Sequence, residues 1–160
     1  MRNILWICLV LLVLSNIGCV KDKMTAYKAT LHNNSGADVL ILPYKNGLVL
    51  SSDTIRLTNG GSIEIANGSD WGDVKVAGFS SDYFGGPNDS TIILFNDSFR
   101  VAHYANVPAT LSSKHYLFES NRNLLNPLNY EFIREKNTKG NFINVHDYYF
   151  TADDYNFARQ

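Results

Sequence analysis

Neither sign of charge dominates this sequence, and cysteine, proline and tryptophan are scarce. Lys and Arg together number 14 against 15 Asp and Glu, so the formal net charge is -1 at pH 7. A chain so close to neutral offers no basic face for phosphates, and we expect no nucleic-acid partner. Only two Cys, four Pro and two Trp occur, whereas Tyr and Phe occur nine times each. This aromatic composition suits half-buried strand surfaces and indicates β structure.

The sequence also lacks the short motifs that mark several enzyme classes. It contains no Gly-x-Ser-x-Gly elbow, no P-loop and no dinucleotide-binding fingerprint. Four histidines occur, at positions 32, 103, 115 and 146, and no two have the spacing that places both imidazoles on one metal ion. We therefore expect no catalytic residue, no metal site and no cofactor. A glycoside hydrolase with two facing carboxylates is an alternative, because Asp and Glu are scattered along the chain.

Only one long apolar run occurs, from Ile4 to Leu14, and it is eleven residues long. A helix that crosses the ~30 Å hydrocarbon core of a membrane needs about 20 residues, so this run is too short to do so alone. It follows Arg2, and this order is typical of a signal peptide. The alternative is a retained N-terminal anchor helix in which the run is extended through Val20.

Gly18 and Cys19 follow directly after this segment, preceded by Asn16 and Ile17. The arrangement resembles the lipobox of bacterial lipoproteins, although Asn16 stands where that motif most often has Leu. In that family the cysteine sulfur is joined to diacylglycerol, the preceding peptide is removed, and the new amino terminus is acylated. The resemblance implies that residues 1–18 are a signal peptide, that Cys19 is lipidated, and that residues 19–25 form a lipidated tether.

A triacylated Cys19 would hold the protein stably on a membrane, because two or more acyl chains are enough for stable anchoring. Cys8 would leave with the signal peptide, so the mature chain would contain no free thiol. Disulfides, zinc sites built on cysteine and a cysteine nucleophile are then excluded. In the lipoprotein family, Val20 after the cysteine is compatible with the outer membrane. We expect a lipid-anchored outer-membrane protein that faces either the periplasm or the outside, with an envelope protein or a glycan as its partner.

Residues 26–160 alternate short strand-like segments with gaps rich in Gly, Asn, Asp and Ser. The expected strands lie at 26–33, 39–43, 54–57, 62–66, 73–79, 90–95, 99–104, 115–119, 129–135 and 143–150. This spacing predicts one all-β domain, an antiparallel β-sandwich that is immunoglobulin-like or similar. The apolar run at 39–43 suggests a strand buried on both faces, and Asn59-Gly60 suggests a hairpin. Thr151 and Asp154 fit a capping box that starts a short helix at 151–160.

The stretch from Ser90 to Ala158 also resembles a group of small cell-envelope lipoproteins of gut Gram-negative bacteria. In these proteins a β-rich domain ends with a Tyr-rich strand and a T-x-x-D-Y turn, here Thr151, Asp154 and Tyr155. The group has no established activity. The resemblance therefore implies a location and a fold but no chemistry.

Two loops, at 67–73 and 81–90, combine acidic residues with aromatic ones. Trp71, Tyr83 and Phe84 are our candidates for stacking on a sugar, although turn-forming Asp and Gly with a ring folded over the end of the sandwich explain these loops more simply. The short stretches 53–55 and 89–91 resemble an acceptor pattern for O-glycosylation, which makes Thr54 and Ser90 candidate acceptors. The leading hypothesis is a non-catalytic lipoprotein with an accessory, binding or structural role, and a surface glycan-binding module is the second.

Overall fold

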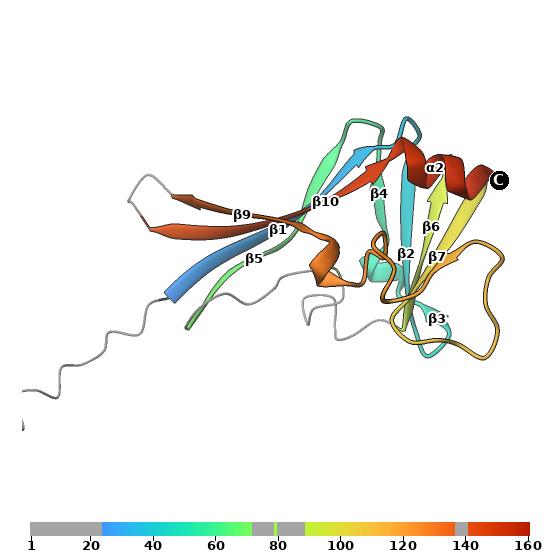
Figure 1. Cartoon of the computed structure of the whole chain (residues 1–160), viewed down its shortest axis with the longest axis horizontal. Helices are drawn as coiled ribbons and strands as arrows, with labels where there is room; N and C mark the ends of the chain where they lie inside the picture. The colour runs from blue at the N-terminus through green and yellow to red at the C-terminus, as the bar shows by residue number, and fades with distance from the viewer. Residues whose placement is uncertain (1–23, 72–78, 80–88, 137–140) are drawn as a thin grey trace, which may run out of the picture.

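The computed structural model describes residues 24–71, 79, 89–136 and 141–160, and these form two packed β-sheets with one short C-terminal helix (Figure 1). The predicted all-β sandwich is therefore confirmed. Of the expected strands, the one at 73–79 lies outside the described residues except for Phe79. Within the part of the chain that is described, no helix has the length and apolar character needed to cross a membrane.

The first sheet, sheet A, has the strand order β5-β1-β10-β9. Its strands are β1 (Met24–Asn34), β5 (Ser62–Trp71), β9 (Glu131–Lys136) and β10 (Phe142–Thr151). β1 pairs with β10 in parallel, whereas its pairing with β5 and that of β10 with β9 are antiparallel. The first and the last described strands thus lie side by side in the middle of the sheet.

The second sheet, sheet B, has the order β3-β2-β6-β7-β8, with β4 also paired to β2. Its strands are β2 (Val39–Lys45), β3 (Leu48–Val49), β4 (Ile55–Leu57), β6 (Ser90–Phe95), β7 (Phe99–Tyr104) and β8 (His115–Tyr116). All its pairings are antiparallel except that of β7 with β8. Both sheets are therefore mixed, with one parallel pair each, where the sequence predicted antiparallel pairing throughout. In the described connections, short 3-10 helices lie at Ser51–Asp53 and Pro127–Asn129.

The core lies between the two sheets and is filled from both of them. The largest almost fully buried side chains include Tyr148, Phe79, Phe95, Phe150, Leu31, Ile41 and Ile93. Phe95 of sheet B and Phe150 of sheet A meet edge to face, with ring centroids 6.4 Å apart. This geometry places the positive edge of one ring against the negative face of the other.

The Asn59-Gly60 turn does not form the predicted hairpin. It joins β4 of sheet B to β5 of sheet A, so it carries the chain from one layer to the other. Gly60 has φ +77° and its N–H donates to the carbonyl oxygen of Asn33 at 2.7 Å, which ties the turn to the end of β1. The hairpin with an Asn-Gly loop is instead Asn46-Gly47, which joins β2 to β3. Both of its loop residues have positive φ, as a tight hairpin turn requires.

The C-terminal helix α2 (Ala152–Arg159) starts at the predicted capping box. The backbone N–H of Thr151 donates to the carboxylate of Asp154 at 2.8 Å. Tyr155 and Phe157 pack against the core, and the Tyr155 ring lies 5.7 Å from that of Phe95. The helix is too short to be stable alone, so this packing is what holds it.

Sheet A is longer than sheet B, and one end of it extends beyond the sandwich (Figure 1). We call this end the arm. It consists of β9 with the beginnings of β1 and β10 and the end of β5, and all six residues of β9 are exposed. The arm lies at the opposite end of the molecule from α2 (Figure 1).

Candidate functional site

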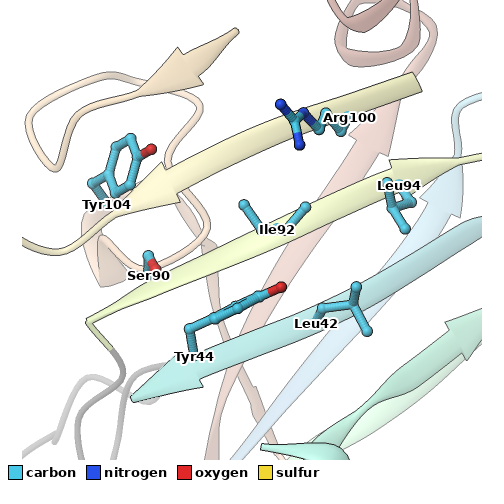
Figure 2. A pocket seen from close by; sticks show the side chains of 7 residues that line it. All are labelled: Leu42, Tyr44, Ser90, Ile92, Leu94, Arg100 and Tyr104. Carbon is cyan, nitrogen blue, oxygen red and sulfur yellow. The ribbon is translucent and has the colours of Figure 1, made fainter. Parts of the chain in front are cut away.

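The outward face of sheet B forms a groove with a volume of about 370 Å³ (Figure 2). Three neighbouring strands build it, because β6 lies between β2 and β7. Its lining residues are Leu42, Tyr44, Ser90, Ile92, Leu94, Arg100 and Tyr104. The strand register sets Tyr44, Ser90 and Tyr104 in one row across the sheet. The groove is therefore a property of the sheet itself and needs no loop to shape it.

The floor of the groove is aliphatic because β2 and β6 carry apolar side chains on both faces. Val39 and Ile41 point into the core, whereas Leu42 is only half-buried on the opposite face. Ile92 and Leu94 of β6 are half-buried in the same way. The prediction that residues 39–43 are buried on both faces is thus wrong, since the second face lines an open groove.

Two tyrosines stand at one end of the groove. The ring of Tyr44 lies along β2 with its hydroxyl directed toward Leu42, and Tyr104 stands across Ser90 on β7 (Figure 2). The Tyr104 hydroxyl accepts a hydrogen bond from the backbone N–H of Ser112 at 3.1 Å. This bond fixes the position of one of the two rings.

Arg100 stands at the other end of the groove, four residues before Tyr104 on β7 (Figure 2). The other described arginines have partners: Arg56 pairs with Asp97, Arg122 pairs with Asp154, and Arg134 and Arg159 lie over aromatic rings. The side chain of Arg100 has no ion pair, hydrogen bond or ring contact among the described residues. Its five N–H donors are therefore available to an anion that enters the groove.

The groove combines an aliphatic floor, an aromatic end and a single cation. Such a surface suits a ligand with an apolar body and one negative group, because each part meets side chains of matching chemistry. No carboxylate is among the lining residues. The groove therefore lacks the pair of carboxyl groups that glycoside hydrolysis requires.

A separate, buried polar network holds the segment 117–130 against sheet B. His103 accepts a hydrogen bond at Nδ1 from the backbone N–H of Leu124 at 2.8 Å. Burial and the nearby charge of Arg122 lower the pKa of His103 to about 3, and burial raises the pKa of Tyr116 to about 12. Asp154 is buried and accepts hydrogen bonds from Arg122. These contacts bind loop, sheet and helix together, so we assign the network a structural role.

The histidines do not gather in one place. His32 lies on the outer face of sheet A, stacked on Tyr149 at 4.6 Å and 3.3 Å from a carboxylate oxygen of Asp147. His103 and His146 are buried on different sheets. Among the described residues no group of three His, Cys, Asp or Glu side chains is arranged to hold a metal ion.

The structure separates the residues that the sequence suggested for function. Cys19, Tyr83 and Phe84 lie outside the described residues, and Trp71 ends β5 with a side chain that is not described. Thr54 is exposed just before β4. Ser90 lies in the groove, half-buried between the two tyrosines. Of these candidates, only Ser90 belongs to the groove.

Sequence reasoning missed the other lining residues, including Arg100 and both tyrosines. The sequence did contain a signal for the aliphatic floor, because β2 and β6 are continuous apolar runs. In the structure, no third layer of described residues covers these strands. Arg100 gave no signal, since an exposed arginine on a strand is ordinary and only the structure shows that it has no partner.

Comparisons with protein-family models, curated proteins and solved structures found no match for this chain. No relative supplies a function. The groove and the residues around Cys19 are therefore the basis for a proposal.

Proposed function

We propose that this chain is a non-catalytic lipoprotein of the outer membrane that binds an amphipathic anion in the groove on sheet B. The order of Gly18 and Cys19 after an apolar run supports the lipid anchor, and Val20 supports the outer membrane. The observation that carries the binding role is the unpartnered Arg100 beside an open aliphatic floor. An envelope component with an apolar body and one acidic group is the ligand class that this chemistry fits.

Each part of such a ligand would contact a different group of lining residues. Its apolar body would cover Leu42, Ile92 and Leu94, which removes half-exposed aliphatic surface from water. Its carboxylate would accept two parallel N–H bonds from Arg100, a geometry that the planar guanidinium favours. The rings of Tyr44 and Tyr104 would close the far end. We infer binding without catalysis because the lining residues include no carboxylate, histidine or cysteine.

A glycan remains the second candidate ligand, because Tyr44 and Tyr104 lie on either side of Ser90 in one row across the sheet. Two rings with a hydroxyl between them form a surface on which a sugar can stack and bond. The earlier candidates for this role, Trp71, Tyr83 and Phe84, stay a prediction. Three aliphatic lining residues and few hydrogen-bonding groups favour the amphipathic anion.

The anchor is tested by mass spectrometry of the mature protein purified from membranes. We expect an N-terminal peptide that begins at Cys19 and carries diacylglycerol and an amide-linked acyl chain. A mature chain that begins elsewhere, or an unmodified Cys19, would contradict the lipoprotein assignment.

The groove is tested by comparing octanoate with octanol, which differ in charge but share the apolar chain. Titration calorimetry on the mature protein in nanodiscs, with empty nanodiscs subtracted, gives both affinities. We expect octanoate to bind about fivefold more tightly, which corresponds to about 1 kcal/mol from a partly exposed charged hydrogen bond. Arg100→Gln removes this preference and leaves octanol binding unchanged.

Arg134→Gln is the matched control, since Arg134 is an exposed arginine on the arm, away from the groove. It keeps the preference for octanoate. Equal affinity of the wild-type protein for the acid and the alcohol would contradict the role of Arg100. Retention of an oligosaccharide that is lost in Tyr44→Ala and Tyr104→Ala would favour the glycan instead.

A further inference from the structure

The start of β1 fixes where a lipid anchor would attach to the domain. β1 begins at Met24 and runs parallel to β10, with Ala26 opposite Ile143. β9 ends at the same place, with Lys136 opposite Phe142. The chain therefore enters the domain at the tip of the arm, far from α2 (Figure 1).

The tether from the anchor is short. Cys19 precedes Met24 by five residues, and an extended chain spans at most about 3.5 Å per residue, or about 17 Å in all. With Cys19 at the membrane surface, the tip of the arm lies within that distance of the lipid headgroups. This part of the argument rests on the lipidation proposed above.

The tip carries a patch of aromatic and basic side chains, which we call the tip patch: Phe132, Arg134, Lys136 and Phe142. The register places all four on one face of the β9–β10 hairpin. Phe132 is 51% exposed and Phe142 is 44% exposed. The guanidinium carbon of Arg134 lies 4.3 Å from the centre of the Phe142 ring, and Nζ of Lys136 lies 5.3 Å from it.

The tip patch is positively charged, and no described carboxylate of β9 or β10 lies on its face. On β9 the acidic Glu131 and Glu135 alternate with the patch residues and so point to the opposite face. Glu135 there pairs with Lys28 at 3.6 Å. The described residues of β10 contribute no carboxylate to the patch face, since Asp147 shares a face with Glu131. Two cations thus stand beside two exposed rings.

We propose that the tip patch is a second membrane contact, which binds the surface of an anionic bilayer and holds the arm against it. Surfaces that combine Phe with Lys or Arg bind at the boundary between headgroups and acyl chains, and each Lys or Arg near an anionic surface adds to the attraction. The lipid on Cys19 holds the tip patch close to the bilayer and so raises its effective concentration there. A patch too weak to bind membranes alone is then still in contact with the bilayer surface. The docked arm sets the distance and the orientation of the groove relative to the membrane.

The test measures the position of the arm, because the lipid keeps every variant on the bilayer. The lipidated protein is placed in nanodiscs with nitroxide-labelled headgroups, made with or without phosphatidylglycerol. The mature chain offers no other thiol once Cys19 is acylated, so Ile133→Cys takes a single fluorophore on the arm. Ser52→Cys, exposed on the 3-10 helix before β4, carries the reference fluorophore.

We expect nitroxide quenching at position 133 to exceed that at position 52, and to rise when phosphatidylglycerol is present. Removing one cation lowers the ratio of docked to free arm about fivefold, and Arg134→Gln with Lys136→Gln lowers it further. Raising the salt to about 1 M shortens the Debye length to about 3 Å and has the same effect. Arg159→Gln, on α2 at the opposite end of the molecule, is the matched control and leaves the quenching unchanged.

Equal quenching at the two positions, or quenching that persists in the double variant, overturns the membrane contact. Mass spectrometry of the same samples separates the two proposals. If Cys19 carries lipid and the arm is not quenched, only the tip patch fails. If Cys19 carries no lipid, the anchor proposal fails. The tip patch proposal then fails as well, unless vesicles containing phosphatidylglycerol bind the full chain and do not bind the variant with both Arg134→Gln and Lys136→Gln.

Discussion

The buried His103 predicts that the domain loses stability as the pH falls below neutrality. Its side chain is on β7 and is only 3% exposed. Nδ1 accepts the hydrogen bond from Leu124, so the neutral ring carries its proton on Nε2. Burial, with a smaller contribution from the charge of Arg122, lowers the pKa of His103 from 6.5 to about 3. The folded protein therefore keeps this ring neutral at a pH where the unfolded chain binds a proton.

The magnitude follows from proton linkage. Above about pH 6.5 both states leave His103 neutral, and the group contributes no pH dependence. Below that value the unfolded state gains a proton and the folded state does not, so the free energy of unfolding falls until the pH reaches about 3. At about pH 5 the loss relative to about pH 8 is about 2 kcal/mol. This is a large part of the roughly 5–15 kcal/mol that stabilises a typical domain.

Urea unfolding, followed by circular dichroism across this pH range, measures the effect. The reference is His103→Asn, because the amide oxygen can still accept the bond from Leu124 and the side chain does not titrate. We expect the variant to be less stable at high pH but to lose about 2 kcal/mol less on acidification. Burial also lowers the pKa of His146, but this contribution is common to both proteins and cancels. Parallel pH profiles of the two proteins would refute the reasoning.

Three substitutions and one control test the packing by their urea midpoints at neutral pH. Asp154→Ala removes the capping box and the ion pair with Arg122, and we expect it to lower the free energy of unfolding by about 3 kcal/mol. The control Asp153→Ala changes an exposed residue and should lower it by less than about 0.5 kcal/mol. Equal losses would contradict the role of Asp154. Tyr130→Phe removes a buried hydroxyl that bonds the backbones of residues 79 and 124, at a cost of about 2 kcal/mol. Gly60→Ala strains a positive φ and costs about 1 kcal/mol.

The strands were largely predictable because period-two alternation and turn residues are local signals. The expected strand at 90–95 coincides with β6, and that at 99–104 coincides with β7. The expected strand at 115–119 was too long, since β8 ends at Tyr116. Three spaced asparagines follow, and the side-chain amides of Asn123, Asn126 and Asn129 donate to the backbone carbonyls of residues 116, 118 and 120. Such side-chain bonds compete with a ladder and end the strand.

Pairing partners were not predictable, because they depend on contacts between residues far apart in sequence. Asn59-Gly60 has the composition of a hairpin turn, yet the strands on either side belong to different sheets. The side chain of Asn33 donates to the carbonyl oxygens of Ala37 and Leu57, which fixes this corner from across the fold. The parallel pairing of β1 with β10 likewise leaves no local trace in the sequence.

The sequence indicated the aliphatic floor of the candidate groove but not its polar residues. Apolar residues at successive positions of β2 and β6 indicated that both faces of these strands have apolar surroundings. The pattern did not distinguish a second packed layer from an open ligand groove, because both remove aliphatic side chains from water. Arg100 and Tyr104 lie on one face of β7 because they are four residues apart, but their distance from Leu42 depends on the order of β2, β6 and β7.

The central position of β1 in sheet A also determines how the domain would resist a pulling force from a lipid anchor. A pull on Cys19 would act along β1 from its first residue, Met24. β1 is paired on both sides, with β10 and with β5, along nearly its whole length. The load is therefore shared by two ladders in shear, and the strand cannot be peeled off one hydrogen bond at a time as an edge strand would be. A central first strand thus suits a domain that is held at its N-terminal end.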